Sequence, residues 1–447
     1  MTANGKSESS DPNMRLLLVH QNFGAFGGAE TNIQITAEVL KQRGHLVALM
    51  HAAETGRSTE SWERTFSTRF RLPANPRQEA VTSALDSFSP DIIYLHALPD
   101  VEVIETLLAS SVPVIRMVHD HSLYCLRSYK YNPLTRTICH RSASLYCAFP
   151  CMAPIARNRD GAFPLRLAGF AAHRKELELT RRCARFIVYS EYSKSELINN
   201  GFDPDKIQIH VPMRCGNNSP SSSLSARNLI VFAGQIIRGK GVDLLLKALA
   251  KLSVPFQCLI LGDGNHRPYC QRLCTRLNLA DRVQFRGFVP ADELQKYYVD
   301  ASVFVVPSVW PEPFGMAGPE AMLYGLPVVA FDAGGIREWL IDGENGFLAP
   351  WMDTDAFALH IEKLLRDKDL ARQMGRNGRE RVNRIYSASH QVDTLEQILR
   401  EVADDRRKQP VKIREPRHGV SLPDFSAFPA SRSVEGLAIP AQQMHKL

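Results

Sequence analysis

Two glutamates, Glu312 and Glu320, are separated by seven residues in the segment VPSVWPEPFGMAGPEAMLYG, which spans 306–325. A buried strand is predicted to end at Pro307, and a Pro/Gly-rich loop then leads to a helix that begins near Gly318–Pro319. The free amides and the positive dipole end of such a helix start favour a phosphate. The alternative is that Glu320 only offsets the helix dipole and that Pro-Glu-Pro is a turn.

Two cations, Arg238 and Lys240, follow another apolar run and lie in a glycine-bearing loop just ahead of a predicted helix. Cations at the carboxyl end of a strand, beside glycines, suit a diphosphate, although a lone solvated loop lysine is the simpler interpretation. Gly27 and Gly28 lie in a similar turn, HQNFGAFGGAE, where they let the backbone approach a ligand. The spacing of this turn does not match the dinucleotide fingerprint.

These residues follow short apolar runs that alternate with helical patterns along most of the chain. The runs lack polar alternation, as expected of strands buried on both faces of a parallel sheet. A polar stretch, CGNNSPSSSLSARN, separates two series of runs, so we predict an α/β protein of two doubly wound domains joined by a linker. The predicted strands are 15–20, 46–51, 92–97, 112–119 and 185–190, then 229–234, 256–262, 283–288, 301–308 and 327–333.

Length and composition agree with this division. The chain has 447 residues, too many for one compact core, and its 44% hydrophobic and 23% charged residues are ordinary for a globular protein. No apolar run is long enough to span a membrane, and the polar first residues lead straight into a strand, so we expect no signal peptide. Nine cysteines are too few for a disulfide scaffold and favour a reducing cytosol. The net charge of +7 indicates an anionic partner.

Taken together, in this order and at these strand ends, the motifs resemble a retaining glycosyltransferase of the GT-B fold, in the large family-4 group. The resemblance rests on EPFGMAGPE, GKG and LGDG, extends through GFVPADEL, YGLPVVAFDAGGIRE and DGENGFLAP, and covers roughly Met14 to Val402. It implies an α/β fold of two doubly wound, Rossmann-like domains that face each other across a cleft. The expected divisions are an acceptor-binding domain at 14–214 with a cysteine-bearing insertion at 121–155, a linker at 215–228, a nucleotide-sugar-binding domain at 229–383, a helix at 384–403 that packs back on the first domain, and a disordered tail at 404–447.

The resemblance assigns donor-binding roles in the second domain. In that family the second glutamate of the pair binds the ribose hydroxyls of a nucleotide sugar, which falls here on Glu320. The first glutamate contacts hydroxyls of the donor sugar near the anomeric carbon, which falls on Glu312. Phe288 stands where the family's backbone contacts the nucleobase. The amides that hold sugar hydroxyls and phosphate are those of Phe314, Gly315 and Met316.

The diphosphate clamp departs from the family pattern at one position. Lys240 matches the family lysine that neutralises the leaving diphosphate. The accompanying arginine, normally five residues earlier, is replaced by Gln235, and Arg238 lies near enough to take its place. These cations stand in for a divalent ion, so the resemblance implies that no cofactor is required.

In the first domain Gly27 and Gly28 match the family loop that approaches the donor phosphate and the acceptor. His119, in the sequence VHD, matches a family histidine near the donor sugar and the reaction centre, whereas a lone histidine at a strand end is more often structural. Transfer in this fold is usually viewed as a front-face, oxocarbenium-like substitution in which the leaving phosphate accepts the acceptor's proton. Catalysis is then mostly positioning and charge stabilisation.

Four cysteines follow His119 within a short span, which suggests a structural zinc site. Two close C-x-x-C pairs are absent, and His140 is an alternative ligand for one thiol position. The other interpretation is buried or loop cysteines that bind no metal. The four thiols are Cys125, Cys139, Cys147 and Cys151.

The stretch from Arg116 to Arg185 holds 13 Lys and Arg against 4 Asp and Glu, with apolar residues interleaved. Such a stretch on the acceptor domain suits docking on an anionic membrane surface and access to a lipid-linked acceptor. A solvated helix face is the alternative, and nucleic acid is a poorer one because no recognised nucleic-acid module is present.

The expected function is transfer of a sugar, with retention, from a nucleotide-diphosphate sugar to a glycan or lipid-linked acceptor during cell-surface polysaccharide or glycolipid synthesis. The enzyme would be cytoplasmic, or peripheral on the inner face of the membrane. One rival is a sugar-nucleotide epimerase or hydrolase on the same scaffold. A second is a degenerate nucleotide-binding subunit, suggested by Gln235 at the arginine position.

Overall fold

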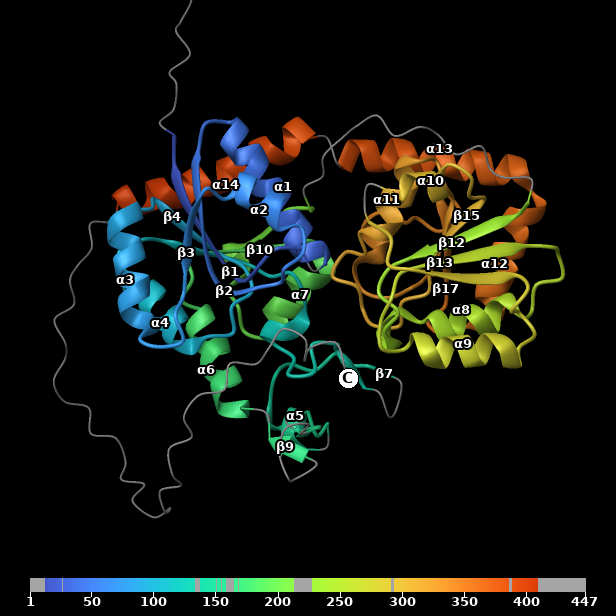
Figure 1. The fold of residues 1–447 in the computed structure, drawn as a ribbon, viewed down its shortest axis with the longest axis horizontal. Coiled ribbons are helices and arrows are strands. Elements are labelled where there is room, and N and C mark those ends of the chain that lie inside the picture. The colour runs from blue at the N-terminus through green and yellow to red at the C-terminus, as the bar shows by residue number, and fades with distance from the viewer. Residues whose placement is uncertain are drawn as a thin grey trace, which may run out of the picture.

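The computed structural model consists of two α/β domains, each built on a parallel sheet (Figure 1). It describes residues 13–25, 27–132, 137–149, 151–153, 155–157, 165–167, 169–212, 227–290, 293–385 and 388–408, with the side chains of 155–157, 165–167, 388–389 and 407–408 left out. The linker predicted at 215–228 lies mostly outside the described residues.

The first domain contains seven parallel strands in the order β11-β10-β5-β4-β1-β2-β3. The chain order reverses between β1 and β4, which makes the sheet doubly wound. All residues of β4 and β5 are buried, as predicted for the centre of a sheet covered on both faces. The strands are β1 (Arg15–Phe23), β2 (Leu46–Glu54), β3 (Thr68–Arg71), β4 (Ile92–Leu95), β5 (Val114–Met117), β10 (Arg185–Val188) and β11 (Ile207–Ile209).

Six helices connect these strands and flank the sheet. The helices are α1 (Gly28–Gln42), α2 (Thr59–Thr65), α3 (Arg77–Phe88), α4 (Val101–Ala109), α6 (Phe170–Thr180) and α7 (Glu191–Asn199). Helix α7 begins where Ser190 accepts a hydrogen bond from the Ser193 amide, an ordinary serine N-cap.

The second domain contains six parallel strands in the order β14-β13-β12-β15-β16-β17, and its chain order reverses between β12 and β15. The strands are β12 (Leu229–Ala233), β13 (Gln257–Leu261), β14 (Val283–Gly287), β15 (Val303–Val306), β16 (Val328–Phe331) and β17 (Gly346–Ala349). The helices are α8 (Val242–Leu249), α9 (Arg267–Arg276), α10 (Gln295–Tyr298), α11 (Ala317–Leu323), α12 (Thr354–Arg366) and α13 (Lys368–Ile385). The prediction of two doubly wound domains is therefore confirmed.

Every predicted strand forms, but burial on both faces is wrong for one edge of the second sheet. In β14 the side chain of Val283 is buried, whereas Gln284 and Arg286 are exposed. Gln257 of the neighbouring strand β13 is exposed as well. At this edge one face of the sheet is open to solvent, so polar residues alternate with apolar ones.

The last helix, α14 (Ala388–Lys408), lies along the first domain although it follows the second in sequence (Figure 1). Glu396 accepts a hydrogen bond at 2.8 Å from Nε2 of buried His45, and the Gln391 carbonyl accepts one at 2.9 Å from Nε2 of His210. The helix runs to Lys408, so the prediction of a disordered tail is wrong for residues 404–408. Arg406 contacts Ser111 of the first domain. Residues 409–447 lie outside the described residues.

The insertion after β5 is held to the first domain by a buried ion pair. The ammonium of Lys130, only 2% exposed, lies 2.8 Å from a carboxylate oxygen of Glu196 and donates a hydrogen bond to the Arg141 carbonyl at 2.6 Å. The insertion contains the turn η1 (His121–Leu123), β6 (Tyr131–Asn132), β7 (Thr137–Ile138), α5 (Leu145–Ala148), β8 (Ile155–Arg157) and β9 (Leu165–Leu167). Among the described residues, no helix is both long and apolar enough to cross a membrane.

Candidate functional site

Lys240 and Glu312 meet at the switch point of the second sheet. Lys240 follows β12 in the turn η3 (Arg238–Lys240), and Glu312 follows β15, the two strands between which the chain order reverses. Nζ of Lys240 lies 2.6 Å from Oε1 of Glu312, and the hydroxyl of Ser308 donates to the same oxygen at 2.5 Å. Ligands of doubly wound sheets bind at such a point because the loops on either side diverge and leave a crevice.

The loops that carry the two charges are tied together by backbone contacts. The amides of Val309 and Trp310 both donate to the Gly239 carbonyl, at 2.9 and 3.1 Å. The indole of Trp310 lies under the Lys240 ammonium, whose Nζ is 4.9 Å from the ring centroid. Lys240 therefore has a carboxylate on one side and an aromatic face on another, which fixes a long and otherwise mobile side chain.

The loop after Glu312 turns at Gly315, whose φ of +82° lies in the region that glycine adopts without strain. The carbonyl of buried Phe314 accepts a hydrogen bond at 2.6 Å from the indole N–H of Trp339. Helix α11 begins at Ala317, slightly earlier than predicted, and Glu320 lies partly exposed in its first turn. The candidate donor residues of this loop are thus held by packing beneath them.

The two domains meet at the glycine turn of the first domain. A Cβ atom built on Gly28 would lie 3.7 Å from Sδ of Met316. Gly27 precedes helix α1, and its amide donates to Oε2 of Glu30 at 3.0 Å. The other oxygen of that carboxylate lies 3.2 Å from Nε2 of His20. Burial alone would raise the pKa of Glu30, but the hydrogen bond and charge of His20 hold it below its usual value.

His119 belongs to a chain of hydrogen bonds at the carboxyl ends of the first sheet. Its Nδ1 lies 2.7 Å from the hydroxyl of Tyr189, which donates to Oδ1 of Asn32 at 3.3 Å. Because that hydroxyl has one hydrogen, Nδ1 of His119 carries the proton and donates to it. Nε2 of His119 then accepts, at 2.9 Å, from Nδ1 of His96. The contacts select one tautomer for each ring.

Both rings of this pair stay neutral. Burial, followed by the charge of His20, lowers the pKa of His119 to about 3, and burial lowers that of His96 well below its usual value. Both ring nitrogens of His119 are engaged within the protein, so it presents substrate with a partly exposed, neutral ring rather than a free basic nitrogen.

The remaining predicted residues follow strands β12 and β14 of the second domain. Arg238 is exposed in the turn that also carries Lys240, and Gln235 is partly buried just after β12. Phe288 follows β14 and is 71% exposed, so its ring is not part of the core.

Comparisons with known proteins agree with the fold. Residues 26–210 match the family described as Glycosyltransferase Family 4, and residues 217–381 match the family described as Glycosyl transferases group 1. The chain belongs to the group 1 glycosyltransferases of the GT-B fold.

Individual relatives cover parts of this glycosyltransferase. Alpha-D-kanosaminyltransferase of Streptomyces kanamyceticus is 31% identical over 182 residues, which cover 40% of this chain and 47% of that protein. Sulfoquinovosyl transferase SQD2 of Arabidopsis thaliana is 28% identical over 317 residues, which cover 69% of this chain and 56% of that protein. The chain spans about half the length of the curated relatives it matches.

Solved structures share the fold at low sequence identity. HepE of Anabaena, in complex with UDP and glucose, has a TM-score of 0.67 at 20% identity, covering 87% of this chain and all of that one. Sucrose-phosphate synthase of Thermosynechococcus elongatus has a TM-score of 0.66 at 19% identity. The match covers 88% of this chain and 100% of that one.

Sequence patterns did not predict several residues that contact the candidate site residues. Ser308 and Trp310 lie within the quoted segment, and only the fold shows that they contact Glu312 and Lys240. His96 and Tyr189 each lie near the end of a predicted strand of the first domain, and this position was their one available signal.

The zinc site suggested by the four cysteines stays a prediction. Among the described residues, which include all four, no group of three or more His, Cys, Asp or Glu could hold a metal. The base of the insertion is stabilised by the buried pair of Lys130 and Glu196. Burial raises the pKa of the Cys125 thiol.

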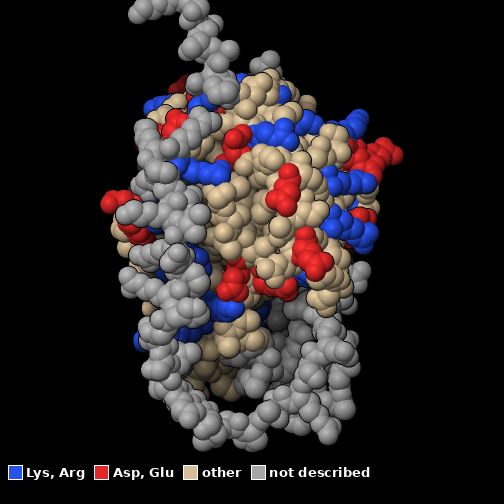
Figure 2. All heavy atoms as spheres, turned by 90° about the vertical axis from the view of Figure 1, so that its left-hand side faces the viewer, with Lys and Arg blue, Asp and Glu red and all other residues tan. Residues whose placement is uncertain are grey.

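Several charges of the basic stretch have structural partners. Arg116 is buried 3.5 Å from Glu176, and the exposed ammonium of Lys175 lies 3.0 Å from Glu105. Figure 2 shows one face of the molecule, and on this face acidic and basic side chains are interspersed. That face therefore does not supply a single-sign cationic surface.

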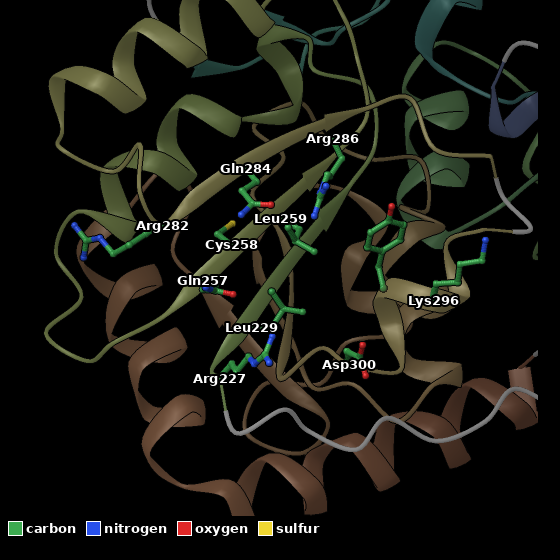
Figure 3. A pocket seen from close by; sticks show the side chains of 11 residues that line it. Arg227, Leu229, Gln257, Cys258, Leu259, Arg282, Gln284, Arg286, Lys296 and Asp300 are labelled. Atoms are coloured by element: carbon green, nitrogen blue, oxygen red, sulfur yellow. The ribbon is translucent and has the colours of Figure 1, made fainter.

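An open hollow of about 700 Å³ lies on the exposed face of β12, β13 and β14 (Figure 3). Gln284 and Arg286 of β14 line it, as do Arg282, which precedes that strand, and Asp300, which follows α10. None of its lining residues belongs to the Lys240 and Glu312 site. The hollow is a consequence of the uncovered sheet edge and is separate from the Lys240 and Glu312 site.

Proposed function

We propose that this protein transfers a sugar, with retention of anomeric configuration, from a nucleotide-diphosphate sugar to a glycan or lipid-linked acceptor. The observation that carries the proposal is the Lys240–Glu312 pair at the switch point of the second sheet, opposite the glycine turn of the first domain. HepE, which shares the fold, was solved with UDP and with UDP-glucose, and we extend that donor class to this chain.

In the proposed reaction the donor diphosphate takes the place of Glu312 as the partner of Lys240. Arg238, on the same turn, adds a second positive charge in the position that Gln235 does not fill. Glu312, released from Lys240, then accepts hydrogen bonds from hydroxyls of the donor sugar. Glu320 holds the ribose hydroxyls, and the amides of the following loop hold phosphate.

The chemical step breaks the bond between the anomeric carbon and the diphosphate oxygen. The acceptor oxygen bonds to that carbon on the same face, and its proton passes to the leaving diphosphate oxygen. The neutral, fully hydrogen-bonded state of His119 supports a step without a protein base at that position. The two cations meet the charge of the leaving group, so the proposal needs no divalent ion.

Ligand binding followed by product analysis tests the proposal. Purified protein is titrated with UDP, GDP and ADP sugars in a thermal-shift assay, with Lys240→Ala as the matched control. We expect one nucleotide class to bind the native protein and to bind the variant at least about tenfold more weakly. Binding by none of them at millimolar concentration would overturn the proposal.

NMR of the product then separates the remaining alternatives. A retained anomeric configuration in a new glycosidic bond supports the transferase. Turnover of the donor without an acceptor identifies an epimerase or hydrolase. Nucleotide binding without any turnover, unchanged by Glu312→Gln, identifies a degenerate binding subunit, the interpretation to which Gln235 points.

We also propose that the protein works in the cytoplasm, on the inner face of a membrane, in cell-surface polysaccharide or glycolipid synthesis. Leu145 and Phe149 of the insertion are 74% and 78% exposed, and the guanidinium of Arg141 lies over the ring of neighbouring Tyr146. Apolar side chains beside cations suit the headgroup region of an anionic bilayer.

Vesicle sedimentation tests this membrane contact. We expect the protein to bind vesicles that contain phosphatidylglycerol more strongly than pure phosphatidylcholine vesicles. The double change Leu145→Ser and Phe149→Ser should weaken binding several-fold and leave nucleotide binding unchanged. Equal binding of variant and native protein would contradict the role of these side chains.

A further inference from the structure

Two residues of the first domain donate hydrogen bonds to the segment Pro311–Pro313, one on each side of Glu312. Nε2 of buried His121 donates to the Pro311 carbonyl at 2.7 Å. The hydroxyl of Ser190, also fully buried, donates to the Pro313 carbonyl at 2.6 Å. Proline has no amide hydrogen, so the carbonyls are the polar backbone groups that each of these two residues offers.

The state of each donor is set within the first domain. Nδ1 of His121 lies 2.8 Å from the hydroxyl of Tyr124. Since Nε2 must carry a hydrogen to reach the Pro311 carbonyl, the Tyr124 hydroxyl donates to Nδ1 and the ring is neutral. Burial lowers the pKa of His121, which favours the same state. Ser190, in turn, accepts from the Ser193 amide while its own hydrogen faces the second domain.

The second domain leaves room for these hydrogen bonds. A Cβ atom on Gly335 would lie 2.5 Å from the Pro313 carbonyl oxygen and 2.9 Å from Oγ of Ser190, so glycine at this position permits the contact. The Gly335 amide also donates to the Glu312 carbonyl at 2.7 Å. Beside it, Glu338 accepts a hydrogen bond from the Glu191 amide at 2.7 Å, at the positive end of helix α7.

A further contact links His121 to the charged residues of the site. The ring of His121 is 5.9 Å from that of Trp310 in an edge-to-face arrangement, and Trp310 also contacts the Lys240 ammonium. A shift of the first domain therefore acts on Glu312 through two carbonyls and on Lys240 through one aromatic ring.

We propose that His121 and Ser190 are positioning residues that make the placement of Glu312 depend on docking of the two domains. Neither residue touches the donor in this proposal. Docking holds the Pro311–Pro313 segment so that Glu312 faces the donor sugar, and separation of the domains releases it. The inference rests on the proposed function in that Glu312 contacts the donor.

Two matched pairs of variants separate the hydrogen bonds from general packing. His121→Leu removes the donor to Pro311, and His121→Gln keeps an amide N–H at a similar reach. Ser190→Asp keeps the cap on the Ser193 amide but has no hydrogen for Pro313 at neutral pH, and Ser190→Thr keeps the hydroxyl.

Hydrogen exchange on the protein alone is the first readout. We expect the amides of Glu312, Phe314 and Gly315 to exchange about tenfold faster in His121→Leu and Ser190→Asp than in the native protein. His121→Gln and Ser190→Thr should stay close to native. Unchanged exchange in the first two variants, or equal acceleration in all four, would overturn the inference.

Kinetics provide the second readout. We expect kcat to fall about tenfold or more in His121→Leu and Ser190→Asp, with nucleoside diphosphate affinity within about twofold of native, because a small misplacement costs rate more than binding. A matching loss of affinity would contradict a positioning role. If the native protein turns over no nucleotide sugar, the proposed function fails, while the exchange result still decides whether docking orders the segment.

Discussion

At the scale of single residues, the site is a set of charges that neutralise one another until a ligand arrives. Lys240 pairs with Glu312, and Glu312 in turn accepts from Ser308. A buried carboxylate with two partners is stable in the free protein, so an incoming diphosphate must exchange one ion pair for another. The proposed reaction therefore depends on the charges of Lys240 and Glu312 more than on their shapes.

Replacing Glu312 by Gln tests that use of charge. The change keeps the volume and one oxygen for Ser308 but removes the partner of Lys240. We expect turnover to fall by about 10²-fold or more while the melting temperature changes little, since Lys240 retains access to water. Initial rates with the identified donor give the measurement, and Glu293→Gln on the exposed surface is the control. A rate within threefold of native would remove Glu312 from the reaction.

The tautomer of His119 can be measured directly. The contacts with Tyr189 and His96 place its hydrogen on Nδ1. We expect ¹⁵N NMR of histidine-labelled protein at pH 7 to show a protonated Nδ1 and a bare Nε2 for this ring. Tyr189→Phe removes the acceptor and should mix the two tautomers, at a cost of about 1–3 kcal/mol for the unmatched buried group. A protonated Nε2 in the native protein would contradict the assigned chain.

At the scale of elements, the site depends on how closely the loops after β12 and β15 approach each other. Gly241, at the start of α8, has φ of +67°, and a Cβ atom there would lie 1.9 Å from the Pro307 carbonyl oxygen. Any side chain would push apart the two loops that bring Lys240 to Glu312. The geometry of the ion pair is thus set by backbone packing as much as by the charges.

Comparing Gly241→Ala with Gly343→Ala separates backbone strain from collision. Gly343 has φ of +76°, but nothing lies within 4 Å of a Cβ atom built on it. We expect Gly343→Ala to lower the free energy of unfolding by about 1 kcal/mol, the cost of a left-handed alanine. Gly241→Ala should lose at least about 2 kcal/mol more because the loops must also separate. Urea titration measures both, and equal losses would rule out the collision.

At the scale of the whole molecule, α14 returns from the second domain to the first. It leaves the second domain after α13 and packs on the first through Glu396 and His45, Asp393 and Arg43, and Gln391 and His210. The helix thereby limits how far the two domains can separate. The contacts of α14 with the first domain and the contacts between the two domains are therefore present in the same arrangement of the domains.

The contact of His210 with α14 predicts a dependence of stability on pH. Burial lowers the pKa of His210, although the Gln391 carbonyl that accepts from it acts in the opposite direction. The unfolded chain, with a pKa of about 6.5, then binds the proton more readily, so stability is complete above that pH and falls as the pH decreases.

His210→Gln keeps an N–H for the Gln391 carbonyl but cannot titrate. We expect the loss of unfolding free energy between pH 7 and 5.5 to become shallower, by at most about 1.4 kcal/mol per pH unit. Urea titrations of native and variant protein at both pH values give the slopes. Identical slopes would show that His210 does not contribute.

The strands and the charged loops were predictable because both follow from local pattern. Ten apolar runs predicted ten strands, and the loops with Lys240 and Glu312 stand directly after two of them. The short strands β3, β11 and β17 were not predicted. Exposure of three of the four β3 residues leaves little apolar signal, and β11 has only three residues. The open face at β14 also depends on which neighbours cover the sheet, which local pattern does not specify.

The sequence alone determined the fold class and the residues that bear charge at the site, since strand periodicity and residue type are local properties. Only the tertiary structure decided that both ring nitrogens of His119 are engaged, and that His121 and Ser190 hold the segment around Glu312. The partners in these contacts are 23 to 190 positions apart in the chain. A hydrogen bond depends on distance and direction between two groups, and folding alone brings groups so far apart in sequence to within 3 Å.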